Sequence, residues 1–304
     1  MGSCFADRMG DRLAQAQFSI SVNPLGIAYH PIALAQLLDW TAEPSLSIKP
    51  QYAEHLQQWH HFGLHTRFNQ EQKATFVQTV QAAHQMAHQA FVRCDRLILT
   101  LGTAMGHRHL AQRQVVNNCH RYPAATFQKG LVPLEEMKER LEVSLLGWKK
   151  ARPELEVLLT VSPIRHLRDT LPLNSVSKAS LRLLCHQLVQ SWEWMHYFPA
   201  YELMMDDLRE YRFYEADMLH PNAVAEQYIW EKLVETHCEA PTQAALKQWE
   251  TIARDLQHRS RQPGSEAHRR FLNQLLTRLE ALPSEIPCQP EMIAVRKQLR
   301  LFEA

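Results

Sequence analysis

Two short apolar runs constrain the fold of this chain most strongly. Arg96 to Leu101 reads RLILTL and stops at Gly102, and Leu155 to Val161 reads LEVLLTV and stops at Ser162-Pro163. A strand that is apolar on both faces is typical of a parallel sheet covered by helices on each side. Because segments with helical spacing separate and follow these runs, we predict βαβ units and a mostly parallel sheet.

The remaining elements are predicted from apolar spacing and from turn residues at their ends. We expect helices over 7–17, 31–40, 69–93 with Asn69 as N-cap, 133–151, 177–194 and 221–237. We expect further strands over 18–22 and 197–205 and an irregular stretch over 41–68.

The last part of the chain differs from the rest. From residue 240 onward the sequence is helical in pattern and strongly charged, with breaks near Gln262-Pro263-Gly264 and around Pro283. We therefore divide the chain into an α/β domain, 1–238, and a helical C-terminal extension, 239–304.

Composition excludes several classes of function. The 33 basic and 32 acidic residues leave a net charge of +1, without the basic excess that nucleic-acid binding requires. No apolar run approaches the roughly 18–20 residues of a membrane span. The six scattered cysteines form no C-x-x-C pair, so we expect free thiols and a cytoplasmic location.

Seventeen histidines raise the question of a metal site. His84 and His88 stand four apart in an expected helix, but no glutamate lies between them as a zinc hydrolase would need. The other histidine clusters lack a carboxylate or thiolate at ligand spacing. We therefore predict neither a metal nor a cofactor.

The segment Gly2-Ser3-Cys4-Phe5-Ala6 stands at the entrance of an expected helix. A serine there lies beside unpaired N–H groups and the positive end of the helix dipole, which stabilise an oxyanion when the serine attacks a carbonyl. Serine is also a favoured N-cap, and this role alone would explain Ser3. Cys4 is an alternative nucleophile, because a helix N-terminus favours the thiolate form.

A second candidate segment is Asp217-Met-Leu-His220-Pro221-Asn222. Pro221 opens a helix and biases His220 away from helical geometry, which leaves its ring on a turn. The spacing of three places Asp217 on the same side of that turn. The carboxylate could then hold one imidazole nitrogen and leave the other free as a base. A solvent-exposed polar turn is the alternative interpretation.

Three positions could donate hydrogen bonds to an oxyanion. Gly26 follows the first expected strand, Thr103 follows the apolar run over 96–101, and Asn118 lies in Asn117-Asn118-Cys119. In open α/β sheets, site residues gather at the carboxyl ends of strands. All three positions could be such ends.

These segments, in this order, resemble the GSCFA family, a branch of the SGNH (GDSL-like) hydrolase superfamily. The motif that names the family stands unbroken at Gly2 to Ala6. Seven family-like segments follow, at 23–28, 99–104, 116–120, 161–166, 174–178, 197–202 and 217–222. The tail after residue 240 shows no such likeness.

The resemblance implies a flavodoxin-like three-layer α/β/α sandwich. It maps the nucleophile onto Ser3, its two partners onto Asp217 and His220, and an oxyanion donor onto Gly26. It implies a serine esterase or deacylase whose substrate is an acyl ester of a small molecule, glycan or lipid. A catalytically inactive protein that keeps the fold for binding or scaffolding is the alternative.

The sequence departs from the superfamily pattern in two places. The third block normally carries an asparagine, whereas Gly102-Thr103-Ala104-Met105 has none, so Thr103 or Asn118 would have to supply that donor. A central strand normally leads into the first motif, but only Met1 precedes Gly2. We therefore expect the first strand of the sheet to be truncated in this chain.

Overall fold

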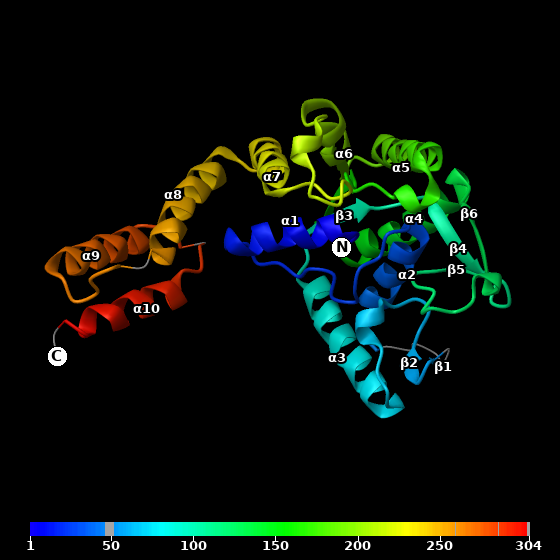
Figure 1. Ribbon diagram of the computed structural model, residues 1–304, viewed down its shortest axis with the longest axis horizontal. Coiled ribbons are helices and arrows are strands. Elements are labelled where there is room, and N and C mark those ends of the chain that lie inside the picture. The colour runs from blue at the N-terminus through cyan, green and yellow to red at the C-terminus, as the bar shows by residue number, and fades with distance from the viewer. Residues whose placement is uncertain (46–51, 259, 285, 303–304) are drawn as a thin grey trace. The chain divides into compact units, whose positions relative to one another are not determined.

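The computed structural model describes residues 1–45, 52–258, 260–284 and 286–302 (Figure 1). The chain forms two compact units. Unit 1 comprises Met1–Gly10 and Ser21–Ile229, and unit 2 comprises Asp11–Ile20 and Trp230–Ala304. Helix α1 (Cys4–Gln15) thus contributes residues to both units.

A three-stranded parallel sheet forms the centre of unit 1. It consists of β3 (Arg96–Leu101), β7 (Glu156–Val161) and β8 (Met195–Phe198), in the order β3-β7-β8. The two apolar runs are therefore adjacent strands, paired from Arg96 with Glu156 to Leu101 with Val161. Leu99, Leu101, Leu159 and Val161 are fully buried, because both faces of this sheet are covered.

The residues before α1 pair with the free edge of β3. Gly2 bridges Thr100 in parallel, Thr100 N–H donates to Met1 O at 3.0 Å, and Ser3 N–H donates to Thr100 O at 3.2 Å. This pairing anchors Ser3 beside the carboxyl end of β3, where α1 begins.

Gly2 allows this close approach. Its φ is +147°, and a Cβ there would lie 2.4 Å from Thr100 O. We expect Gly2→Ala to lower the free energy of unfolding of unit 1 by about 2–4 kcal/mol, because backbone atoms must shift. Urea denaturation followed by circular dichroism measures this loss. Gly147→Ala is the control, since Gly147 lies in helix α4 with open space around it, and alanine there should stabilise by about 0.5–1 kcal/mol. Equal stability of the two variants would contradict the close approach.

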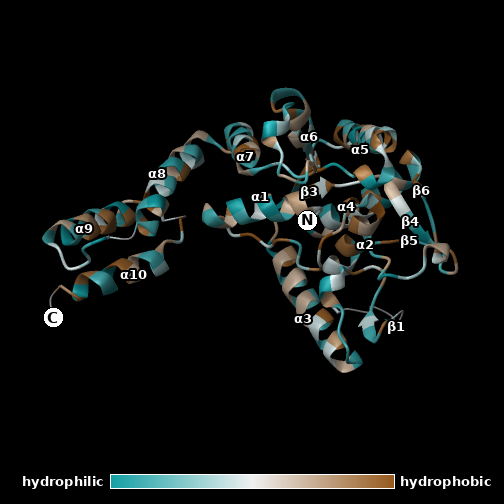
Figure 2. Cartoon of the chain, viewed as in Figure 1, coloured by the Kyte–Doolittle hydropathy of each residue, from teal (hydrophilic) through white to brown (hydrophobic). Residues whose placement is uncertain are grey.

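Helices surround the central sheet. They are α2 (Pro31–Ala42), α3 (Lys73–Val92), α4 (Leu134–Ala151), α5 (Leu171–Ser191) and the short α6 (Ala200–Glu202). Helix α7 (Ala223–His237) begins in unit 1 and ends in unit 2. Helix α2 packs against α3 and α4, and α5 packs against β7 and β8. The Trp148 indole of α4 donates to Leu38 O of α2 at 2.9 Å. Figure 2 shows the hydrophobic residues along α2 that this packing covers.

Two smaller antiparallel sheets were not predicted from the sequence. The first contains β4 (Met105–His109), β5 (Gln114–Val116) and β6 (Phe127–Leu131), in the order β5-β4-β6. The second pairs β1 (Ala53–His55) with β2 (Gln58–His60), inside the stretch expected to be irregular. These short strands are rich in histidine and other polar residues, so their apolar pattern is weak. The fold is therefore mixed α/β.

Three local predictions were wrong in place or type. Residues 18–22 form no strand; instead the Val22 side chain packs against Gly10 of α1. The third strand of the central sheet ends at Phe198, because Pro199 leads into α6. Helix α3 begins at Lys73 after Gln72, whereas Asn69 ends the short 3-10 turn Thr66–Phe68.

Unit 2 is helical. It contains α8 (Ala240–Gln257), α9 (Glu266–Glu280) and α10 (Gln289–Arg300), with α9 and α10 running side by side in Figure 1. The Trp249 indole donates to Gln15 O at 2.7 Å, which ties the end of α1 into this unit. Its core is formed by Trp249, Ile252, Leu272, Leu275, Leu279, Cys288, Met292 and Val295. Within the described ranges, no helix of either unit combines the length and apolar character needed to span a membrane.

Candidate functional site

Asp217 and His220 form a directly bonded pair. Asp217 Oδ2 and His220 Nδ1 lie 2.6 Å apart, and Asp217 Oδ1 accepts the backbone N–H groups of Leu219 at 2.8 Å and His220 at 3.0 Å. These two backbone hydrogen bonds and the ring contact lower the pKa of Asp217 to about 2. The carboxylate therefore stays ionised and orients the ring, which leaves Nε2 as the nitrogen that can accept a proton.

The backbone of this segment is held as a closed turn. Tyr214 bridges Pro221 in antiparallel fashion, and Glu215 N–H donates to His220 O at 2.8 Å. The Asn222 side chain then caps α7 by accepting the N–H groups at the helix start. His220 thus stands on a rigid turn that leads directly into a helix.

Ser3 occupies the N-cap of α1. Its side chain is buried, and Oγ accepts Phe5 N–H at 3.3 Å. Within the described part of the chain, no hydrogen bond joins Ser3 to His220. The hydroxyl therefore serves as a helix cap in this structure, and its proton is not committed to the histidine.

Contacts between neighbouring elements nevertheless link the two segments. Arg8, early in α1, forms an ion pair of 3.7 Å with Glu226, early in α7. Each helix begins shortly after one candidate residue, Ser3 for α1 and His220 for α7. Unit 1 therefore places these two helix N-termini in the same region.

A second series of contacts runs from Cys4 toward His220. Cys4 Sγ lies 2.9 Å from the Tyr29 hydroxyl, and the Tyr29 ring meets His166 edge-on at 5.8 Å. Burial, the Lys178 charge and, to a smaller extent, the His220 charge lower the pKa of His166 to about 4. His166 is thus a neutral imidazole that contacts Tyr29 and senses the charge of His220.

The three predicted oxyanion donors take part in other contacts. Gly26, with φ of +93°, donates its N–H to Asn23 O at 2.8 Å. Thr103 donates its N–H to Tyr29 O at 3.1 Å, and its hydroxyl lies 3.1 Å from Ser177 Oγ. Asn118 Oδ1 accepts His120 N–H at 2.9 Å, while its side-chain N–H₂ has no protein acceptor among the described residues. All three residues therefore stabilise the loops in which they lie through these hydrogen bonds.

Two residues important for the site region were not predicted from the sequence. Asn23 is fully buried, accepts Gly2 N–H at 2.7 Å through Oδ1 and donates to Asp7 at 2.6 Å, so it holds the segment that carries Ser3. Lys178 donates to Gly102 O at 2.8 Å and to Ser162 O at 2.7 Å, which joins the ends of β3 and β7. Burial lowers the pKa of Lys178 to about 7. Both residues lie in family-like segments, and this position was the only feature of the sequence that could have indicated their importance.

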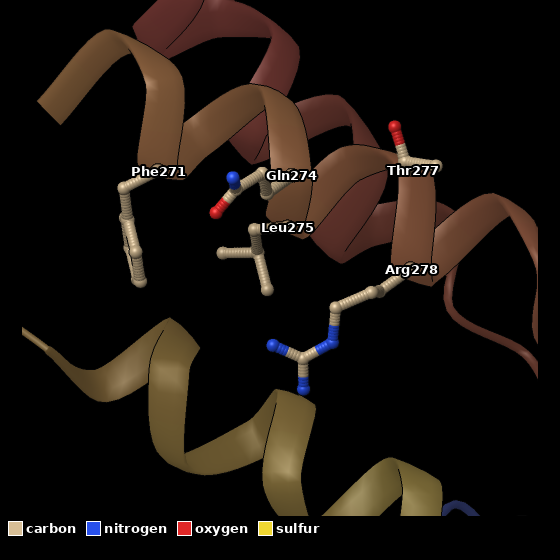
Figure 3. Close-up of a pocket in the computed structure, with 5 residues that line it drawn as sticks. All are labelled: Phe271, Gln274, Leu275, Thr277 and Arg278. Atoms are coloured by element: carbon tan, nitrogen blue, oxygen red, sulfur yellow. The ribbon is translucent and has the colours of Figure 1, made fainter. Parts of the chain in front are cut away.

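Another carboxylate–histidine pair, Glu156 with His196 at 2.8 Å, joins β7 to β8 at an exposed position. Among the described residues, no three histidine, cysteine or carboxylate side chains gather in a way that could hold a metal ion. A cavity of about 370 Å³ in unit 2 is lined by α9 residues, with Phe271, Leu275 and Arg278 pointing toward a neighbouring helix (Figure 3). Arg278 is paired with Asp255 of α8, and this cavity has no acid–base pair.

These features define an α/β protein with an ordered Asp–His pair and a separate helical unit. A model of the GSCFA family matches residues 1–233, and the chain therefore belongs to this family. A model of the C-terminal domain of GSCFA domain proteins matches residues 249–301. The tail thus has a family likeness that the sequence analysis missed. Searches of curated proteins and of solved structures give no match.

Proposed function

We propose that this GSCFA protein is a serine hydrolase of the SGNH type that cleaves an acyl ester of a small molecule, glycan or lipid. The observation that carries the proposal is the Asp217–His220 pair, with 2.6 Å between carboxylate and ring and with the carboxylate ordered by two backbone N–H groups. The parallel β3-β7-β8 sheet, with Met1–Ser3 beside β3, is compatible with a flavodoxin-like sandwich as the parent architecture.

In the proposed mechanism Ser3 Oγ attacks the ester carbonyl while His220 Nε2 takes its proton. The same nitrogen then protonates the departing alcohol, which leaves an acyl-serine. Water, deprotonated by His220, attacks this acyl group and restores Ser3. Backbone N–H groups at the start of α1 stabilise the oxyanion, with the side-chain N–H₂ of Asn118 as a further donor. Gly26 and Thr103 could contribute only after leaving their present acceptors, Asn23 O and Tyr29 O.

The mechanism requires Ser3 Oγ to exchange its cap contact with Phe5 for a hydrogen bond to His220. Catalytic hydrogen bonds in ligand-free sites are often long and tighten only when substrate binds. The cap contact is 3.3 Å, at the long end for a hydrogen bond, so this exchange costs little.

The nucleophile is tested with a fluorophosphonate probe. We expect the wild-type protein to be labelled, Ser3→Ala to lose labelling, and Cys4→Ala to retain it. The Cys4→Ala variant is the matched control, because it changes the adjacent residue on the same helix entrance. Labelling that persists in Ser3→Ala, or disappears in Cys4→Ala, would contradict Ser3 as the nucleophile.

A second candidate function is an inactive binding or scaffold protein that keeps the fold. The observation that favours it is the engagement of Ser3 Oγ by Phe5 N–H, with no bond from Ser3 to His220 in the described residues. Under this alternative neither wild type nor Ser3→Ala reacts with the probe, and the two hydrolyse a short-chain aryl ester equally.

A further inference from the structure

Arg165 is attached to the turn that carries His220. It follows β7, and its backbone N–H donates to Leu219 O at 3.3 Å. Leu219 directly precedes His220, so the Arg165 backbone is fixed relative to the proposed base.

The guanidinium of Arg165 lies over two tyrosine rings of the same region. It is 4.1 Å from the centre of the Tyr214 ring and 5.4 Å from that of Tyr211. Tyr214 is buried and bridges Pro221, the residue after His220. Stacking on a ring uses the face of the guanidinium and leaves its in-plane N–H donors available.

These donors have no carboxylate partner in the described parts of the chain. Acidic groups of the site region have other partners, since Asp217 binds His220, Asp169 pairs with Lys129 and Asp206 pairs with Arg209. Three other partly buried arginines of unit 1 do have such partners: Arg108 with Glu136, Arg140 with Asp39 and Arg182 with Glu202. A half-buried cation without a counter-charge is costly, and an incoming anion would relieve that cost.

Two other cations near the site do not offer free donors. Lys178 is buried and donates to two backbone carbonyls, and Lys129 is paired with Asp169. His166 is neutral near pH 7, because burial lowers its pKa to about 4. Among the described residues of this region, Arg165 is thus a half-buried cation with no carboxylate partner, whereas Arg168, which also has none, is exposed.

We propose that Arg165 binds an anionic group, a carboxylate or a phosphate, that the ester substrate carries close to the scissile bond. This inference rests on the proposed hydrolase function and specifies its substrate class. A guanidinium presents two parallel N–H donors to such a group, which positions the substrate as well as attracting it. Tyr214 and Tyr211 hold the guanidinium plane in place.

The inference is tested with two aryl acetates of similar reactivity, 4-acetoxybenzoate, which is anionic, and its neutral methyl ester. We expect Arg165→Met to raise KM for the anionic ester by about 10- to 100-fold, the range for loss of charge-assisted hydrogen bonds. KM for the methyl ester should change less than about threefold. Arg165→Lys should recover part of the preference for the anionic over the neutral ester. Lysine keeps the positive charge but lacks the two parallel N–H donors of the guanidinium.

The matched control is Arg212→Met. Arg212 also lies over an aromatic ring, 4.8 Å from the centre of Phe213, but it is paired with Glu210 at 2.9 Å. This variant should leave both KM values unchanged. If Arg165→Met raises KM for the two acetates equally, Arg165 only stabilises the turn that carries His220, and the inference is wrong.

Binding without catalysis separates the inference from the proposed function. Isothermal titration of Ser3→Ala with benzoate and with phenyl phosphate should show binding that the additional change Arg165→Met abolishes, and the tighter of the two identifies the anion. Such binding without ester hydrolysis by wild type would support the anion site and reject the hydrolase. Hydrolysis without Arg165-dependent binding would reject the anion site alone.

Discussion

Asp217→Asn is expected to lower kcat/KM for ester hydrolysis by about 10⁴-fold, the effect typical of the corresponding change in serine hydrolase triads. The asparagine Oδ1 can still accept the N–H groups of Leu219 and His220, so the turn should persist. The amide N–H₂ would then face His220 Nδ1 and force the proton onto Nε2. The ring would lose its ability to accept a proton from Ser3. Initial rates with a short-chain aryl ester measure this loss.

Glu215→Gln is the control for this prediction. It makes the same change of charge two residues away, on an exposed side chain of the same segment. We expect less than a twofold change in its kcat/KM. In a Ser3→Ala background, Asp217→Asn should cause little further loss, because residues that act as a unit are not additive. A full additional loss in that background would show that Asp217 acts independently of Ser3.

Unit 1 is expected to lose stability on mild acidification. Burial is the main cause that lowers the pKa of His30 to about 3 and the pKa values of His61, His120 and His166 to about 4. The unfolded chain then binds more protons than the folded chain between about pH 6.5 and pH 4. Stability from these histidines is therefore complete above pH 6.5 and is lost as the pH falls. We expect about 2 kcal/mol of lost stability for each imidazole with a pKa near 4 between pH 7.5 and pH 5.

Urea denaturation at the two pH values measures this loss, and two matched variants assign it. His120→Gln removes one buried imidazole and should reduce the difference in unfolding free energy between pH 7.5 and pH 5. His186→Gln makes the same substitution at an exposed position of α5 and should leave that difference unchanged. Asp217 does not contribute to the stability difference between pH 7.5 and pH 5, because its lowered pKa affects stability only below about pH 4. A stability that is flat between pH 7.5 and pH 5 would contradict the neutral buried state of these histidines.

The sequence was most informative for features that residues close together in the chain specify. The apolar runs at 96–101 and 155–161 become neighbouring parallel strands, and Asp217 and His220, three residues apart, meet on one turn. Pro31, Pro133 and Pro221 predicted the starts of α2, α4 and α7 to within two residues. The strands β4, β5 and β6 were missed, because their pairing joins polar segments whose pattern carries no period-2 signal.

Contacts between distant residues could not be predicted from the sequence. Gly2 pairs with Thr100 and is held by the Asn23 side chain 21 residues away, and Arg165 lies over the Tyr214 ring. No local pattern specifies such pairs, since each depends on how the sheet and its helices pack. The Ser3 cap of α1 is different, because it joins residues two apart and was an alternative that the sequence offered.

The sequence by itself determined the family, the alternation of buried strands and helices, and the Asp217–His220 turn. These follow from short-range spacing, which the chain keeps wherever its elements are placed. Only the tertiary structure decided that Met1–Ser3 pairs with β3, that Lys178 joins the ends of two strands, and that Arg165 lies over Tyr214 and bonds to Leu219 through its backbone. Burial and the satisfaction of buried polar groups are properties of the packed chain, so they become visible only when distant segments meet.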